Sequence, residues 1–214
     1  MLTFVSGNIY VMTENEQKIL QAAEEEFLRV GYDACSTAVI ASKVGVTHAM
    51  VNYYYRTKEK LFLQILDNHV SDLLHTLQPL MTLGGQFVDV VTAAALALYD
   101  KLSANRRLVL LISDVARTHP EFLLRYKEAF DTICRDSVEN HAVRLRQYIA
   151  DGTVAPCTMA DVYATVVTLV TTPFTLLPML ENVAAYTPEQ VDAFLRSRRE
   201  EMSHILQSRY SINV

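Results

Sequence analysis

The chain has 214 residues, of which half are hydrophobic and a fifth are charged. This composition excludes a disordered chain, because there is enough apolar surface for the core of one domain or two small ones. The net charge of −5 excludes a chain that is basic throughout, so any contact with nucleic acid needs a local excess of cations.

The N-terminal segment from Met1 to Met12 has no basic residue before its apolar stretch, so it does not resemble a signal peptide. We expect a flexible arm there, and Met12 is an alternative natural start. Three widely spaced cysteines, Cys35, Cys134 and Cys157, form no Cys-x-x-Cys pair. They favour reduced thiols in the cytoplasm over a disulfide framework, with a redox-sensing thiol as the alternative.

The first region of the chain is predicted to consist of helices with well-marked ends. A capping box at Thr13 starts the first helix, and Gly31 ends it. Two short helices are expected at residues 37–44 and 48–54. A longer helix begins at Lys58 and carries apolar residues along one side.

The remainder of the chain also has few helix breakers and many Ala, Leu and Val residues. We find no convincing strand, repeat or low-complexity tract, so the predicted fold class is all-α. The further helices are expected at residues 87–102, 106–117, 120–150, 159–180 and 188–209.

One uncharged stretch of the chain is long enough to be considered as a membrane span. Between Asp161 and Glu181 no residue is charged, and this length could span a bilayer. However, the stretch contains five Thr and two Pro residues, and no basic cluster lies beside it. We therefore prefer a buried helix at a subunit interface and expect no membrane partner.

The run from Thr37 to Tyr55 has the residues that a helix-turn-helix needs at fixed spacing. Ala41 is small where the two helices touch, and Gly45 tolerates a positive φ at the turn four residues later. Thr47 can cap the second helix, whose N-terminus then points into the major groove of DNA.

The residues around this run suit contact with DNA. Asn can pair with adenine edges, Ala can meet a thymine methyl, and Tyr hydroxyls suit phosphate oxygens. The segment has a local excess of cations, which are Lys43, Arg56, Lys58 and Lys60.

The segment from about Gln17 to Phe62 resembles the DNA-binding domain of the TetR family of repressors. The resemblance covers about the first quarter of the chain and rests on the order and spacing of several parts. These parts are Ala22-Ala23, Phe27, Gly31-Tyr32, Ile40-Ala41, Gly45-Val46-Thr47, Val51-Asn52-Tyr53-Tyr54-Tyr55 and Thr57-Lys58-Glu59-Lys60-Leu61-Phe62. It implies DNA-contact positions at Thr37, Thr47, His48, Ala49, Asn52, Tyr53, Tyr54 and Lys58.

The resemblance also implies two domains, with a three-helix helix-turn-helix domain at residues 13–60 and a helical effector-binding and dimerisation domain at residues 61–214. The partners it implies are an operator of double-stranded DNA, a small-molecule effector, and a second copy of the chain bound through the last two helices. The expected function is a ligand-responsive, homodimeric repressor on a palindromic operator.

Aromatic residues of the second domain could line an effector pocket, although ordinary core packing explains each of them as well. These residues are Phe87, Tyr99, Phe122, Tyr126, Phe130 and Phe174.

Enzyme chemistry finds little support in the sequence. Neither a His-Glu-x-x-His motif nor a Gly-rich phosphate loop is present, so we expect no catalytic residues, no metal site and no cofactor. Two alternatives to a ligand-responsive regulator are a helical carrier of apolar ligands and an architectural DNA binder without an effector.

Overall fold

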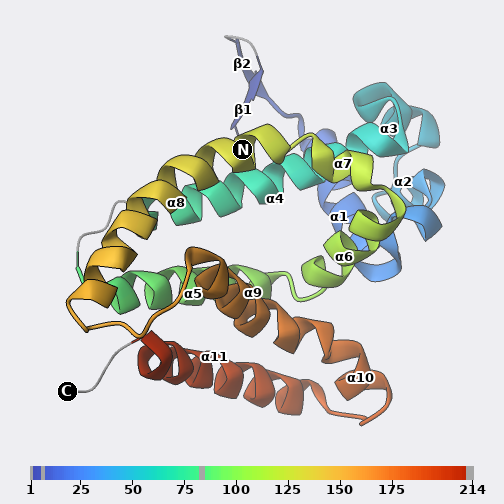
Figure 1. Ribbon diagram of the computed structural model, residues 1–214. Coiled ribbons are helices and arrows are strands. Elements are labelled where there is room, and N and C mark those ends of the chain that lie inside the picture. Colours follow the sequence, from blue (N-terminus) through green and yellow to red (C-terminus); the bar gives the residue numbers. More distant parts are fainter. Residues whose placement is uncertain (1, 6–7, 82–84, 211–214) are drawn as a thin grey trace. The chain divides into compact units, whose positions relative to one another are not determined.

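The computed structural model describes residues 2–5, 8–81 and 85–210, and the side chains of residues 12–77, 85–128 and 141–210. The chain forms two units, Met1–Ser71 and Asp72–Val214. The division lies within the long helix α4 (Lys58–Met81), beyond the boundary at residue 60 that we expect between the functional domains. Figure 1 shows the helices that make up each unit.

A β-hairpin precedes the helices. Strand β1 (Leu2–Val5) pairs in antiparallel fashion with β2 (Asn8–Val11), and Leu2 lies opposite Val11. A paired hairpin differs from the flexible arm that we expect from the sequence. The strands contain Val, Ile, Tyr and Phe, which favour extended backbone, and pairing satisfies backbone groups that one segment alone cannot satisfy. Apart from this hairpin the described residues are helical, and the all-α fold class is confirmed.

The first unit contains α1 (Glu14–Ala34), α2 (Thr37–Lys43), α3 (His48–Tyr55) and the start of α4. The predicted capping box is present, since the hydroxyl of Thr13 accepts from the N–H of Glu16 and the Glu16 carboxylate accepts from the N–H of Thr13. Gly31, with φ of 81°, interrupts α1, and a last turn follows to Ala34.

Aromatic rings form the centre of the first unit. The ring of Phe62, at the start of α4, lies 4.9 Å from that of Phe27 and 4.8 Å from that of Tyr32, centroid to centroid. Phe27 and Phe62 are fully buried, as are Ile19 and Ile40. This core fixes α1 against α2, α3 and α4.

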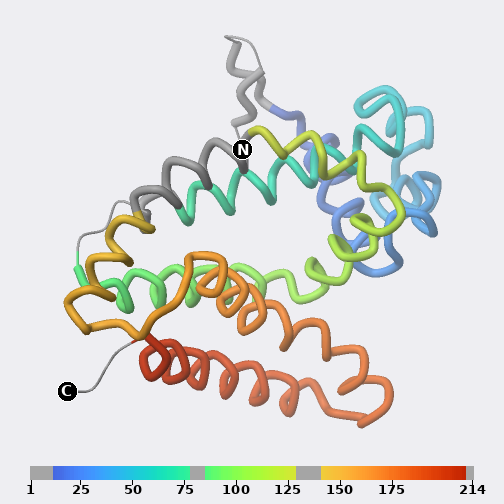
Figure 2. Tube along the Cα trace, viewed as in Figure 1, coloured from blue at the N-terminus to red at the C-terminus, as the bar shows by residue number. Residues whose placement is uncertain are grey.

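The second unit is a helical bundle in which α5 packs against α9 and α11, and α9 also packs against α11 (Figure 2). The hydroxyl of Tyr99 on α5 donates to the carbonyl of Leu195 on α11 at 2.8 Å, and both groups are buried. The helices of this unit are α5 (Phe87–Ala104), α6 (Leu108–Thr118), α7 (Pro120–Leu124), α8 (Lys127–Ala150), α9 (Met159–Thr175), α10 (Leu177–Asn182) and α11 (Pro188–Tyr210).

Two helices that the sequence predicts as continuous are divided. The predicted helix 120–150 is two helices, because a tight turn closed by the N–H of Tyr126 and the carbonyl of Leu123 separates α7 from α8. No Gly or Pro marks this turn. The predicted helix 159–180 ends at Thr175, and Pro178 is near the start of α10. Pro178 has no N–H to donate to the preceding turn, so the helix breaks there.

The uncharged stretch between Asp161 and Glu181 lies in α9 and α10. Within the described residues, Met159–Asn182 is long and apolar enough to cross a membrane, with a mean hydropathy of 1.5. Only 33% of its most apolar window is buried within the chain, so much of its apolar surface faces outward.

Candidate DNA-binding site

The predicted helix-turn-helix is formed by α2, the turn at Gly45 and α3. Ala41 is buried at the contact between the helices, and its carbonyl accepts from the N–H of Val46 at 3.0 Å. Gly45 has φ of +70°, and an added Cβ would meet no atom within 4 Å. Glycine is therefore favoured at this turn by its positive φ and not by a lack of space for a side chain.

Helix α3 is capped at its N-terminus and anchored on one side. The hydroxyl of Thr47 accepts from the N–H of Met50 at 3.3 Å. Val51 and Tyr55 are buried, and the Tyr55 hydroxyl donates to the carbonyl of Glu16 on α1 at 2.9 Å. These contacts determine which side of α3 faces outward.

The side of α3 opposite this anchor is exposed and polar. Tyr53 is 71% exposed, and its ring meets the half-buried ring of Tyr54 edge-on at 5.3 Å. The exposed residues, here called the outer face of α3, are Thr47, His48, Ala49, Asn52 and Tyr53.

A side-chain hydrogen bond connects the first residues of α2 and α3. The hydroxyl of Thr37 and Nε2 of His48 lie 2.9 Å apart. This bond restrains the His48 ring and leaves Nδ1 available for another partner. Thr37 and His48, which are both predicted DNA-contact positions, thus contact each other, a contact that the sequence does not indicate.

The side chain of Lys58 is directed toward the protein. Its ammonium group donates to the carbonyls of Tyr32, Asp33 and Cys35 at 3.0 to 3.2 Å, and it lies 4.5 Å from the centre of the Tyr32 ring. These carbonyls belong to the end of α1, where helical hydrogen bonding ceases. Lys58 therefore joins the start of α4 to the end of α1.

A buried carboxylate joins α1 to α2. Both oxygens of Glu26 accept from the guanidinium of Arg29, at 2.6 and 3.1 Å, and one also accepts from the ammonium of Lys43 at 2.7 Å. Hydrogen bonds from Arg29 and then Lys43 lower the pKa of Glu26 to about 2. Lys43 is thus exposed but paired within the protein, and Arg56 and Lys60 are exposed as well.

We expect Glu26→Gln to lower the stability of the first unit in a way that depends on pH. Loss of charge-assisted hydrogen bonds costs about 1.5–3 kcal/mol at neutral pH. Because the pKa of Glu26 is lowered from 4.5 to about 2, its stabilising effect is complete above pH 4.5 and disappears as the pH falls toward 2. Thermal unfolding between pH 2 and 7 measures this difference. Glu25→Gln, at an exposed site, is the control, and equal losses in both variants would contradict the prediction.

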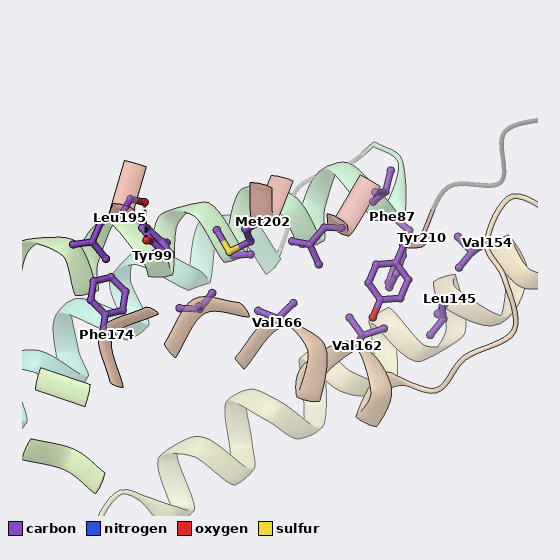
Figure 3. Close-up of a cluster of buried hydrophobic side chains, with 14 of the residues drawn as sticks. Phe87, Tyr99, Leu145, Val154, Val162, Val166, Phe174, Leu195, Met202 and Tyr210 are labelled. Atoms are coloured by element: carbon purple, nitrogen blue, oxygen red, sulfur yellow. Dashed lines mark hydrogen bonds between the residues drawn. The ribbon is translucent and has the colours of Figure 1, made fainter. Parts of the chain in front are cut away.

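The residues predicted to line an effector site lie at separate places in the second unit. The rings of Tyr99 and Phe174 lie 5.0 Å apart at one end of the buried cluster, and Phe87 lies near Tyr210 at the other end (Figure 3). Both groups belong to one continuous apolar core between α5, α9 and α11.

The other three predicted residues belong to α7, α8 and the turn between them. Phe122 is buried and stacks on His119 with centroids 5.1 Å apart, and Tyr126 is buried beside Arg125. Phe130 is in α8, and its side chain lies outside the described residues.

Sequence reasoning missed the polar contacts that hold the helix-turn-helix together. The Thr37–His48 bond and the Glu26–Lys43 pair join residues far apart in the chain, so no local pattern indicates them. The buried role of Tyr55 had a signal, because it follows the apolar Val51 by four residues and so shares its side of a helix.

The fold and the outer face of α3 define a helix-turn-helix DNA-binding protein with a second, helical unit. Residues 19–65 match the model of the family described as bacterial regulatory proteins, tetR family. This match identifies the first unit as the DNA-binding domain found in that family, and the chain is a DNA-binding transcriptional regulator. The match implies operator DNA as a partner, and the matched family is not enzymatic.

Known proteins resemble the chain well beyond this first region. The transcriptional activator FasR of Mycolicibacterium smegmatis is 28% identical over 159 residues, which cover 70% of this chain and 71% of that protein. The structure of the ketosteroid transcriptional regulator KstR2 of Mycobacterium tuberculosis has a TM-score of 0.69 at 16% identity, covering 95% of this chain and 98% of that one. A transcriptional regulator from Streptomyces coelicolor, SCO4942, has a TM-score of 0.63 at 20% identity, covering 91% and 97%. At these identities the two structures show a shared fold.

Proposed function

We propose that the outer face of α3 enters the major groove of the operator. The main support is that α3 is anchored through Val51 and Tyr55, which leaves the opposite side free to meet base edges. Asn52 and His48 supply hydrogen-bonding groups, and Thr37 and Tyr54 flank this face as contacts to the DNA backbone. For Lys58 we propose a positioning role, since its three donors bind the end of α1.

We propose that the regulator acts as a homodimer through α9, α10 and α11. Large apolar side chains are exposed on these helices and on the residues that join them, and exposed apolar surface of this kind is typical of protein interfaces. Two subunits related by a two-fold axis would place two α3 helices about one DNA turn apart on a palindromic operator in the cytoplasm. The exposed apolar residues are Tyr163, Val167, Leu176, Met179, Val183 and Ile205.

We propose that the second unit, as a domain of residues 61–214, binds an apolar effector at its aromatic residues. The core between α5, α9 and α11 consists mainly of apolar side chains, including Phe87, Tyr99 and Phe174, so an effector there has to be largely apolar. The effector would favour one of two conformations by its difference in affinity for them. Release of operator DNA by apolar compounds, followed by fluorescence anisotropy, tests this step.

We propose repression as the direction of regulation, and activation is the alternative that the name of FasR favours. A bound dimer that covers a promoter represses by excluding polymerase. A reporter gene behind the operator distinguishes the two, because deletion of the regulator raises expression under repression and lowers it under activation.

A matched pair of tyrosine variants tests the proposed orientation of α3. We expect Tyr53→Phe to weaken operator binding about tenfold, the effect of losing one hydrogen bond to a charged group, about 1.5 kcal/mol, and to leave stability unchanged. Tyr55→Phe removes the buried hydrogen bond to Glu16 and should lower the melting temperature instead. Gel-shift titration and thermal unfolding measure both. Unchanged binding by Tyr53→Phe would count against the proposed surface.

A further inference from the structure

The residue after α3 has a backbone conformation that favours glycine. Arg56 has φ of 64° and ψ of −53°, and its N–H donates to the carbonyl of Asn52 at 2.9 Å. Among the described residues other than glycine, positive φ occurs at Arg56 and Ala185. This conformation is higher in free energy for a residue with a Cβ atom than it is for glycine. A side chain kept at a strained position indicates a use for that side chain.

Among the described residues of the first unit, the side chain of Arg56 makes no polar contact that could offset the cost of its strained backbone. It is exposed, and within the part of the chain that the structure describes it has no hydrogen bond or ion pair. Two other cations nearby differ, because Lys43 binds Glu26 and Lys58 binds three carbonyls. The strained backbone therefore holds a cation that is free to meet an outside anion.

Arg56 lies at the C-terminal end of α3, close in sequence to residues of the outer face. Its N–H continues the helical hydrogen bonding by one residue, so it lies one turn beyond Asn52 and three residues after Tyr53. Thr57 follows and caps α4 through the N–H of Lys60. The guanidinium thus belongs to the end of α3, where a helix lying in the groove passes the sugar-phosphate backbone.

We propose that Arg56 binds a phosphate of the operator and adds affinity that does not depend on base sequence. This rests on the proposed orientation of α3. The guanidinium can form two parallel hydrogen bonds to phosphate oxygens, a geometry that a lone ammonium lacks.

Three substitutions at this position separate phosphate binding from a structural role. We expect Arg56→Gly to raise the melting temperature by about 2–4 °C, because glycine relieves the strain. The same variant should bind operator and unrelated DNA more weakly by the same factor, and the slope of log affinity against log salt should fall by about 1 per subunit. Arg56→Ala should weaken binding equally without the gain in stability, and Arg56→Lys should keep most of the salt slope.

The outcomes that would overturn the proposal are distinct. A lower melting temperature for Arg56→Gly would mean that the side chain stabilises the fold. An unchanged salt slope would exclude a phosphate contact, and a loss confined to the operator would indicate base reading. If Tyr53→Phe weakens binding while Arg56→Gly does not, only the Arg56 proposal fails. If neither variant weakens binding, the proposed orientation of α3 fails as well.

Discussion

Replacing Phe62 with Ala should abolish operator binding by unfolding the first unit. Phe62 is fully buried, and its ring contacts those of Phe27 and Tyr32, which join α4 to α1. Removal of a buried Phe side chain typically costs about 3–5 kcal/mol, a large part of the stability of a small domain. Because α3 depends on this core for its position, the outer face of α3, which we propose reads DNA, is lost with it. Gel shift and amide hydrogen exchange of the first unit measure the two effects.

Two variants serve as controls for this result. Phe62→Leu keeps much of the volume and should retain most of the binding. Val39→Ala truncates a residue of the same unit that is 43% exposed, so it should leave both folding and binding nearly unchanged. Binding by Phe62→Ala within tenfold of the natural protein would mean that the aromatic core does not hold α3 in place.

Replacing Val167 with Glu should convert the proposed dimer to monomers and weaken operator binding at least a hundredfold. Val167 on α9 is 54% exposed although it lies in a stretch that is apolar enough to cross a membrane. A carboxylate buried there in a dimer interface has no partner, so dimerisation is disfavoured. A monomer then contacts a single half-site. Sedimentation velocity measures the assembly state, and anisotropy measures the affinity.

Val143→Glu is the matched control for this substitution. Val143 on α8 is 56% exposed, so the same change is made at similar exposure outside the proposed interface. It should leave the dimer and its DNA affinity intact. A dimer that survives Val167→Glu would place the interface elsewhere on the chain.

Much of the first unit could be predicted because its signals are local. Capping residues at Thr13 and Thr47, the glycine turn at Gly45 and the apolar spacing of the helices all act within a few residues, and the structure has each of them. The expected roles of the cations were harder to predict. Which partner binds Lys43 or Lys58 depends on how α1 packs against α2 and α4, and this is set by contacts distant in sequence.

The second unit was predictable as helices and much less so as a binding site. A helical pattern does not indicate a break such as the turn at Tyr126, because no Gly or Pro marks it. Aromatic residues fit a core and an effector site equally well by composition. The structure locates Tyr99 and Phe174 together and Phe87 at a distance, which a list of aromatic residues does not reveal.

The spans of the hydrogen bonds in the two units bear on the order in which they fold during synthesis. In the first unit these hydrogen bonds join residues closer in the sequence, since Tyr55 and Glu16 are 39 positions apart and Lys58 and Tyr32 are 26 positions apart. In the second unit Tyr99 binds a residue 96 positions later, and Asp100 binds Arg199 at a separation of 99. Short-range contacts form faster, and N-terminal domains fold first on the ribosome. We expect the DNA-binding unit to fold before α11 has been synthesised and can pack against α5.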